Sequence, residues 1–457
     1  MSGFIPKYKE LMLGRTFAPS IALTVLIGHL FGLEILSAGI FTVLTVSVFL
    51  MLNTARPAMA SLALFMYQMS RQNSLSAPSN SDFLKSPPAV ICMVVYGTAI
   101  IASIAYFIIK HRVYKKIKGN IPLVLYATFA FSLSLCLNGI FSGKWMINNL
   151  FFALIQSFVY IFFFMLFYYG TSEGDSVERI TDDLIDIASL SAIILIVEMT
   201  AMYLTQDGVL VDGAINKEAI SLGWGIYNPI GGMIVVLIPL IFLAIMRGRR
   251  LSLYLPLALL TYIFGVLTLS RNALLFGTLT VGVCCIISAF WGKHKRFFKI
   301  FIIATLAVGA LGIVLLWSKI SSVFADFINR GFSDNGRFDL WRAAVAAFLD
   351  NPIFGSGFFA YDADYFKHLS FMPELPHNTI LAFLSAGGLV LTLTYLLYRA
   401  VTLIPFIKKP SAELSLLTFS FMLLPLMSLL DNFTLNFYPT FLYTLTLITI
   451  TKRTKGK

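Results

Sequence analysis

Residues 89–109 read AVICMVVYGTAIIASIAYFII, a stretch without one charged side chain that ends directly before Lys110. A helix needs about 20 mostly apolar residues to cross a hydrocarbon core about 30 Å thick. This stretch therefore predicts a transmembrane helix. Similar apolar runs recur from end to end of the chain, so the same interpretation extends outward from this segment.

The chain as a whole has the composition of a membrane protein. Of its 457 residues, 58% are hydrophobic and 12% are charged, whereas soluble domains average about 25% charged residues. We predict an all-α polytopic membrane protein with about 12–14 transmembrane helices and one large, partly helical extracytoplasmic loop. The predicted spans are residues 17–32, 34–52, 57–70, 89–109, 121–141, 146–168, 184–204, 229–246, 251–269, 272–291, 298–317, 377–398, 414–430 and 436–450.

The net charge of +12 indicates orientation and does not indicate nucleic-acid binding. The basic residues cluster in short segments between the predicted spans, and Lys/Arg-rich short loops stay on the cytoplasmic side of a membrane. Both termini are then expected in the cytoplasm. The basic segments are residues 110–118, 247–250, 293–299, 399–409 and 452–457. The four cysteines lie in apolar runs without Cys-x-x-Cys spacing or a nearby His, so we expect no metal site and no disulfide.

The largest polar segment, residues 318–376, is where we expect an active site. Unpaired backbone groups cannot lie in lipid, so this loop must lie outside the bilayer or line a wet cavity. Within it, residues 337–349 (RFDLWRAAVAAFL) predict a helix with an apolar stripe at helical spacing, formed by Phe338, Trp341, Val345 and Phe348. Trp341 would be its interfacial anchor. We divide the chain into N-terminal helices (1–224), a catalytic region (225–400) and C-terminal helices with a basic tail (401–457).

Several short motifs then resemble one known family. Residues 336–362 read GRFDLWRAAVAAFLDNPIFGSGFFAYD, and residues 376–398 read PHNTILAFLSAGGLVLTLTYLLY. Earlier, residues 269–275 read LSRNALL and residues 227–232 read YNPIGG. An Arg followed by a Trp, a Pro-x-x-Gly-x-Gly turn, and a His-Asn pair opening a Gly-containing span resemble the signature of the O-antigen ligase and polymerase family. The resemblance covers roughly residues 225–398.

This resemblance implies a function and a set of site residues. The family's two essential arginines fall on Arg271 and Arg337, and its essential histidine falls on His377. The arginines are implied to bind the diphosphate of an undecaprenyl-linked glycan donor, and the histidine to activate the acceptor hydroxyl, with inversion at the anomeric carbon. No metal, nucleotide or other cofactor is implied. The implied acceptor is a glycan, a lipid core or another molecule. The implied location is the bacterial plasma (inner) membrane, in contact with membrane lipid, with an extracytoplasmic active site.

Elementary chemistry supports these three residues. A diphosphate leaving group gains negative charge as the glycosidic bond breaks, and fixed cations that meet this charge lower the barrier. Arginine binds phosphate oxygens with two parallel N–H groups and never loses its proton. A neutral imidazole, with an ordinary pKa of about 6.5, can accept the hydroxyl proton.

Each of these residues also has a structural interpretation. Arg271 at a span end can snorkel to the interface, Arg337 can pair with Asp334 or Asp339, and either His377 or Asn378 can cap a helix. Glu374, Asp362 and Asp364 are alternative bases or sugar-binding residues. The further candidate substrate-binding residues are Ser270, Asn228, Trp341, Arg342, Glu198 and Asn378.

Two other functional classes fit the hydropathy. A transporter or flippase for lipid-linked saccharides also needs many spans and basic groups. It typically shows paired broken helices around a midplane site, which the sequence does not reveal. A non-enzymatic scaffold of an export complex is the weaker alternative.

Overall fold

The computed structural model describes residues 4–69, 87–117, 121–143, 145–147, 150, 153–154, 158–172, 174–222, 226–315, 317, 337–358, 376–408, 410–430 and 437–455. Predictions that concern other residues lie outside this described part of the chain. They include the alternative bases or sugar-binding residues Glu374, Asp362 and Asp364 and most of the loop at residues 318–376.

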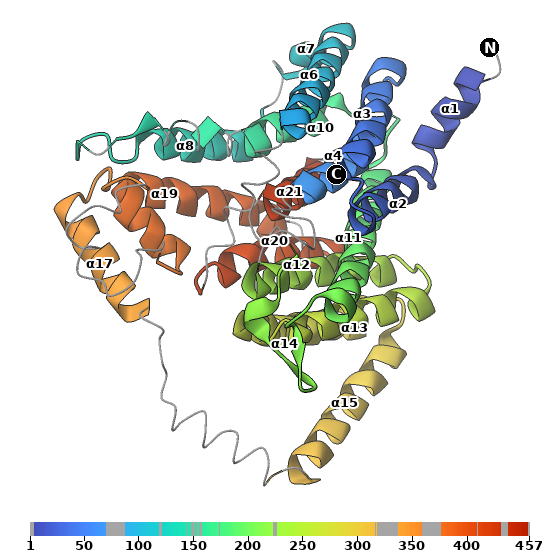
Figure 1. The fold of residues 1–457 in the computed structure, drawn as a ribbon, viewed down its shortest axis with the longest axis vertical. Coiled ribbons are helices and arrows are strands. Elements are labelled where there is room, and N and C mark those ends of the chain that lie inside the picture. The colour runs from blue at the N-terminus through green and yellow to red at the C-terminus, as the bar shows by residue number, and fades with distance from the viewer. Residues whose placement is uncertain are drawn as a thin grey trace.

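The described chain is almost entirely helical (Figure 1), which confirms the predicted all-α polytopic membrane fold. In the described ranges the strands are β1 (Leu210–Val211) and β2 (Ala214–Ile215), which pair antiparallel. The helices are α1 (Phe4–Leu13), α2 (Phe17–Leu30), α3 (Glu34–Met51), α4 (Ala58–Met69), α6 (Pro87–Lys110), α7 (Val113–Ile117), α8 (Leu123–Leu137), the π-helix η1 (Phe158–Phe162), α10 (Phe163–Gly170), α11 (Val177–Thr205), the short η2 (Lys217–Ala219), α12 (Tyr227–Met246), α13 (Leu251–Leu267), α14 (Arg271–Trp291), α15 (Lys295–Leu315), α17 (Arg337–Asp350), α19 (Thr379–Lys408), α20 (Ala412–Met427) and α21 (Phe437–Lys455).

Helix α12 is the central element. Its sequence is apolar on every face, and such a helix is stable only when it is surrounded. All its residues from Ile230 to Met246 are buried, with α11, α13, α14 and α20 packed against it. This helix therefore organises the part of the molecule that carries Arg271 at the start of α14.

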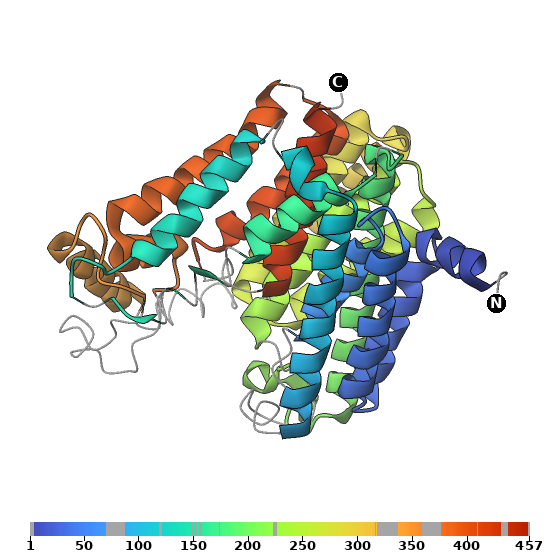
Figure 2. The same ribbon diagram turned by 90° about the horizontal axis from the view of Figure 1, so that it is seen from above.

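Three helices form an arm beside this bundle. Helices α8 and α19 lie side by side, and α17 packs on α19. Figure 2 shows that these helices meet the others near the C-terminal end of α19 and diverge from them toward α17. We call α8, α17 and α19 the arm and the other helices the bundle.

The two ends of the bundle differ in chemistry. Arg247, directly after α12, contacts Glu413 in the first turn of α20 at 3.1 Å, so these two helices run antiparallel. We call this the charged end. Helices α12, α14 and α19 begin at the opposite end, together with the C-terminus of α20, and we call it the motif end.

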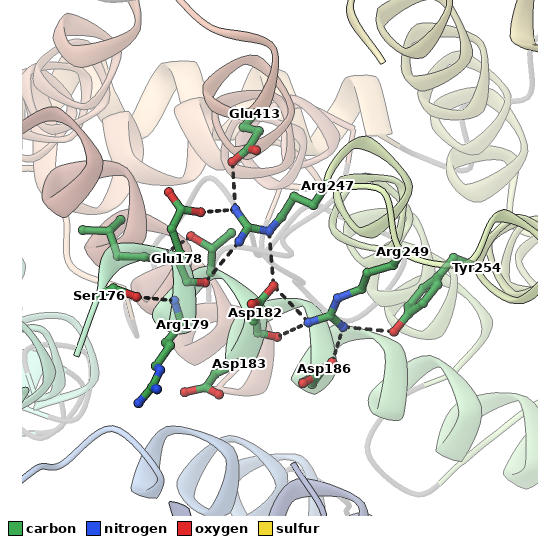
Figure 3. A network of polar contacts seen from close by, with 12 residues as sticks. Ser176, Glu178, Arg179, Asp182, Asp183, Asp186, Arg247, Arg249, Tyr254 and Glu413 are labelled. Carbon is green, nitrogen blue, oxygen red and sulfur yellow. Dashed lines mark hydrogen bonds and ion pairs between the residues drawn. The ribbon is translucent and has the colours of Figure 1, made fainter. Parts of the chain in front are cut away.

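An ionic network holds the helices together at the charged end (Figure 3). Acidic side chains in the first turns of α11 bind the two arginines that follow α12. Arg247 lies 3.2 Å from Asp182 and also contacts Glu178, while Arg249 lies 3.0 Å from Asp182 and also contacts Asp186. Basic residues that we predicted as orientation signals therefore also join helices.

The same end contains a more deeply buried ion pair. Arg56, just before α4, donates from Nε to Asp175 at 2.9 Å and from Nη1 to Asp183 at 2.9 Å. Thr54 and Ser172 also donate hydrogen bonds to Asp175. The acidic segment before and within α11 thus connects α4, α12 and α20 at the charged end.

Six described helices are long and apolar enough to cross a membrane, or seven if the bent pair at residues 6–13 and 17–30 counts as one. They are α3, α6, α11, α12, α14 and α19; α8, α13 and α20 are apolar but shorter. Only 22% of the crossing window of α6 is buried, as expected for a helix that faces lipid. The count of 12–14 spans remains a prediction.

One predicted boundary is wrong. We expected a span at residues 377–398 followed by a basic hinge at residues 399–409. Instead, α19 continues to Lys408, with a break at Gly388, and Arg399 is buried in its interior. The aromatic rings around the Arg399 side chain explain why the helix can continue through a charged position.

Candidate active site

The turn before α14 is built to hold Arg271 in place. Ser270 caps α14, because its Oγ accepts from the Ala273 N–H and donates to Asn228 Oδ1 at 2.8 Å. A Cβ at Gly231 of α12 would lie 2.6 Å from Ala273 Cβ, so this glycine allows the close approach of the two helices. The Ser-Arg and Asn-Pro motifs therefore meet in space. Ser270 and Asn228 serve first to fix the backbone at Arg271, which is exposed.

Arg337 opens α17, as the helical pattern predicted. The helix runs from Arg337 to Asp350, and its buried face consists of Leu340 and three alanines. Arg337 is half-buried, and its Nη1 donates to the carbonyl of Leu430 at 3.2 Å. Of the two partners that we considered for Arg337, Asp339 instead pairs with Arg342, and Asp334 lies outside the described residues.

His377 lies directly before α19, where it is half-buried. Asn378 caps this helix, because its Oδ1 accepts from the N–H groups of Ile380 at 3.0 Å and Leu381 at 3.1 Å. The Thr379 N–H donates to the carbonyl of Ser428 at 2.8 Å. The capping role is thus taken by Asn378, and His377 is not needed for it.

Arg337 and the start of α19 therefore converge on one feature, the turn at residues 428–430 that follows α20. Arg337 binds its last carbonyl, and the residue two positions after His377 binds its first. Sequence reasoning missed this turn, because its contacts are made by backbone carbonyls that no side-chain pattern reveals.

The packing of α20 shows that Arg271 lies at the same end of the molecule as this turn. Helix α20 packs against both α12 and α14 and runs antiparallel to α12. A 20-residue helix such as α12 is about 30 Å long, so its first turn, bonded to Ser270, lies a full span away from Arg247. Arg271 and the turn at residues 428–430 consequently lie at the same end of the bundle, the motif end.

The Pro-x-x-Gly-x-Gly motif and the glycines of α19 are two halves of one structure. The turn at residues 352–357 docks onto the break in α19 through four backbone hydrogen bonds. These run from Ser356 N to Ser385 O (2.8 Å), Gly357 N to Ala386 O (2.8 Å), Leu389 N to Pro352 O (2.8 Å) and Val390 N to Ile353 O (3.1 Å). We call this arrangement the interlock.

Two glycines make the interlock possible. Gly355 and Gly388 both have positive φ, at 65° and 62°, a region that other residues rarely adopt. A Cβ on Gly355 would collide with the Ala386 backbone, and a Cβ on Gly388 would collide with the Ile353 carbonyl. The interlock thereby ties α17, and with it Arg337, to the helix that begins beside His377.

A third segment completes the interlock from α8. The Gly139 N–H donates to the Phe354 carbonyl at 2.8 Å, and the buried Asn138 side chain accepts from the Phe358 N–H at 3.4 Å. No motif pointed to these two residues. They show that the arm is held by backbone contacts among all three of its helices.

The remaining predicted site residues are placed as follows. Glu198 is fully buried in α11. The Arg342 side chain is 82% exposed, while Trp341 is half-buried and stacks edge-on with Phe338 at 5.4 Å. Phe338 and Val345, part of the predicted apolar stripe, are exposed, so this stripe faces away from α19.

The residue types at the motif end suit an anion and a proton transfer. Arg271, at the positive N-terminal end of a long helix, and Arg337 suit a diphosphate, and the His377 imidazole suits proton transfer. Among the described residues, no three His, Cys, Asp or Glu side chains are grouped as metal ligands.

Comparison with known families matches residues 256–396 to the family described as O-antigen ligase. The matched stretch contains Arg271, Arg337, the turn at residues 352–357 with the break in α19, and His377, whereas Asn138, Gly139 and Asn228 precede it. The resemblance predicted from the motifs is confirmed for this stretch. No curated protein matches the chain.

Proposed function

Because residues 256–396 belong to the O-antigen ligase family, we propose that this chain is a membrane glycosyltransferase that moves an undecaprenyl-diphosphate-linked oligo- or polysaccharide onto an acceptor hydroxyl. In general terms the family places it among lipid-linked glycan transferases. The observation that most supports the finer proposal is the convergence of Arg337 and the His377 segment on the turn at residues 428–430.

The arginines act on the leaving group. Arg271 and Arg337 bind the donor diphosphate, and they stabilise the negative charge that grows on it as the bond to the anomeric carbon breaks. Arg337 uses one N–H on the Leu430 carbonyl, which leaves other N–H groups of its five for phosphate oxygens.

His377 acts on the acceptor. The acceptor oxygen forms a bond to the anomeric carbon while the diphosphate departs with the electron pair of the broken bond, and the hydroxyl proton passes to the imidazole. Such base assistance typically contributes about 10²–10⁴ in rate. Attack opposite the leaving group inverts the anomeric centre. Ser270, Asn228 and Asn378 act indirectly by fixing the backbone on either side of the site.

The chain is an integral membrane protein, and we propose that its motif end faces outward. The charged end carries the basic segments at residues 110–116 and 293–299, as expected for a cytoplasmic side. The candidate site is then extracytoplasmic, at the level of a lipid diphosphate headgroup.

A reconstitution experiment tests this function. Purified protein mixed with an undecaprenyl-diphosphate glycan and candidate acceptors should form a new glycosidic bond and release undecaprenyl diphosphate, with the rate unchanged by EDTA. A His377→Gln variant should lose about 10²–10⁴ in rate. Activity that disappears with EDTA would contradict the metal-independent mechanism. Movement of intact donor across vesicles without bond formation would favour the flippase alternative.

A further inference from the structure

The candidate site is divided between the arm and the bundle. Arg337 and His377 belong to the arm, whereas Arg271 begins a bundle helix. A displacement of about 1 Å between reacting groups can cost about 10²-fold in rate. The contacts that fix the arm against the bundle therefore matter for the reaction.

Arg399 of α19 lies where the arm meets the bundle. The residue is 5% exposed, and its three guanidinium nitrogens are buried. Four rings surround the guanidinium, with centroids 4.6 Å (Tyr443), 4.7 Å (Tyr395), 5.0 Å (Tyr398) and 5.5 Å (Phe421) away. We call these four rings the cage.

The cage connects the two parts of the molecule. Tyr395 and Tyr398 belong to the arm, while Phe421 comes from α20 and Tyr443 from α21. A cation is attracted to the face of an aromatic ring, and this attraction is strongest where water is excluded. Because no carboxylate competes for Arg399 among the described ion pairs, its charge is shared between arm and bundle rings.

Neighbouring contacts extend the junction in both directions. Phe131 of α8 stacks on Tyr398 at 5.9 Å, and Phe421 stacks on Tyr443 at 3.7 Å. The far end of α20 carries the turn at residues 428–430, which binds Arg337 and Thr379. A shift of α19 relative to α20 at the cage would therefore also change the positions of Arg337 and of the start of α19 beside His377.

We propose that Arg399 is a positioning residue for the glycan transfer: the cage around it sets the angle between arm and bundle, so that Arg337 and His377 are presented to Arg271. The statement about catalysis rests on the proposed function. The statement about the angle does not, and it can be measured separately.

Spin-label distances measure the angle directly. In a background with the four native cysteines replaced by alanine, labels are placed at Leu349 of α17 and Leu275 of α14, both exposed. Arg399→Met keeps the volume and removes the charge, and it should broaden or shift the distance distribution. Arg179→Met, an exposed arginine at the charged end, is the matched control and should leave the distribution unchanged.

Kinetics provide the second measurement. Arg399→Met should lower kcat at least tenfold with KM for the donor changed less than twofold, because the diphosphate contacts themselves remain. Unchanged distances in folded Arg399→Met protein would overturn the inference even if transfer is established. Failure of the wild-type protein to transfer glycan would refute the proposed function and leave the distance result standing.

A second pair of variants covers the case in which Arg399→Met does not fold. Arg399→Lys keeps the cation with a smaller contact area, and Tyr443→Leu removes one bundle ring while keeping Arg399. Both should broaden the same distance distribution relative to wild type. If either folded variant retains the wild-type distribution and kcat, Arg399 does not position the arm.

Discussion

Arg337 binds a backbone carbonyl where a carboxylate was also available nearby. Asp339, two residues on, pairs with Arg342 instead, and the Leu430 carbonyl is the described acceptor for Arg337. A neutral carbonyl fixes the guanidinium without cancelling its charge, so the full charge stays available for an anion. A bound carboxylate would compete with phosphate for the same N–H groups.

Replacing Arg337 tests whether the planar guanidinium geometry is needed for glycan transfer. Lysine keeps the charge but cannot bind the Leu430 carbonyl and a phosphate with the same fixed geometry. We expect Arg337→Lys to lose nearly as much kcat as Arg337→Ala, on the order of 10²–10³-fold, the range seen when one transition-state donor is removed. Steady-state glycan transfer measures this, with Arg179→Lys as the control for a generic Arg→Lys change. Full activity in Arg337→Lys would contradict the bidentate role.

At the scale of elements, the interlock explains why separated motifs occur together. The turn at residues 352–357 needs a place where α19 exposes backbone groups, and the break at Gly388 supplies it. Helix α17 in turn packs on α19 through small side chains, Ala343, Ala344 and Ala347. The motif residues from Pro352 to Gly357 are thus largely structural.

Glycine substitutions test the interlock. Gly355→Ala and Gly388→Ala each add a Cβ that collides with backbone atoms and force a positive φ on alanine, a combination that should destabilise the protein by more than about 1 kcal/mol. Thermal unfolding in detergent and glycan transfer should both decline. Gly97→Ala in α6 and Gly282→Ala in α14 have open space around the new Cβ, so these two controls should be neutral or stabilising. Equal behaviour of all four variants would refute the interlock as a required contact.

The acidic segment before α11 makes a pH-dependent contribution. Burial raises the pKa of the Asp175 carboxyl, but hydrogen bonds from Thr54 and Ser172 and the charge of Arg56 lower it, and the net pKa is below its ordinary value. A carboxyl with a depressed pKa in the folded state contributes stability above its unfolded pKa of about 3.9, and this stability is lost as the pH falls through the folded pKa.

Asp175→Asn should therefore lower the melting temperature at neutral pH. The loss of charge-assisted hydrogen bonds corresponds to about 1.5–3 kcal/mol. Lowering the pH below about 4 should destabilise the wild type more than the variant. Melting curves in detergent across this range measure both effects. Asp212→Asn, in the exposed turn of the β1–β2 hairpin, should match the wild type at every pH. Parallel pH profiles for wild type and Asp175→Asn would show that Asp175 does not contribute in this way.

The sequence predicted the individual helices far better than the tertiary contacts between them. Apolar length located the helices, because crossing lipid imposes one composition on every span. The motifs predicted Arg271, Arg337 and His377 as site residues, and their roles stay a prediction. The break at Gly388 and the burial of Arg399 were missed. The residues next to a glycine or an arginine in an apolar run do not reveal which distant residues it contacts in the fold. The turn at residues 428–430 was missed because it acts through carbonyls.

At the scale of the whole molecule, the separation of chemistry between the two ends is the feature on which orientation depends. The charged end combines paired arginines, such as Arg247 and Arg249, with basic segments at residues 110–116 and 293–299. The motif end carries Arg271, Arg337 and the β1–β2 hairpin. Since short basic loops are retained in the cytoplasm, the whole site must face outward if this rule holds here.

Cysteine labelling on intact cells tests that orientation. Lys217 lies in the segment after the hairpin at the motif end, with its side chain 41% exposed. Lys115 lies in α7 at the charged end and is exposed. In a cysteine-free background, Lys217→Cys should react with a membrane-impermeant maleimide added outside, whereas Lys115→Cys should react only after lysis. The two positions serve as controls for each other, because each must become labelled in lysed cells. The reverse pattern would place Arg271, Arg337 and His377 in the cytoplasm, where a donor presented at the outer leaflet could not reach them.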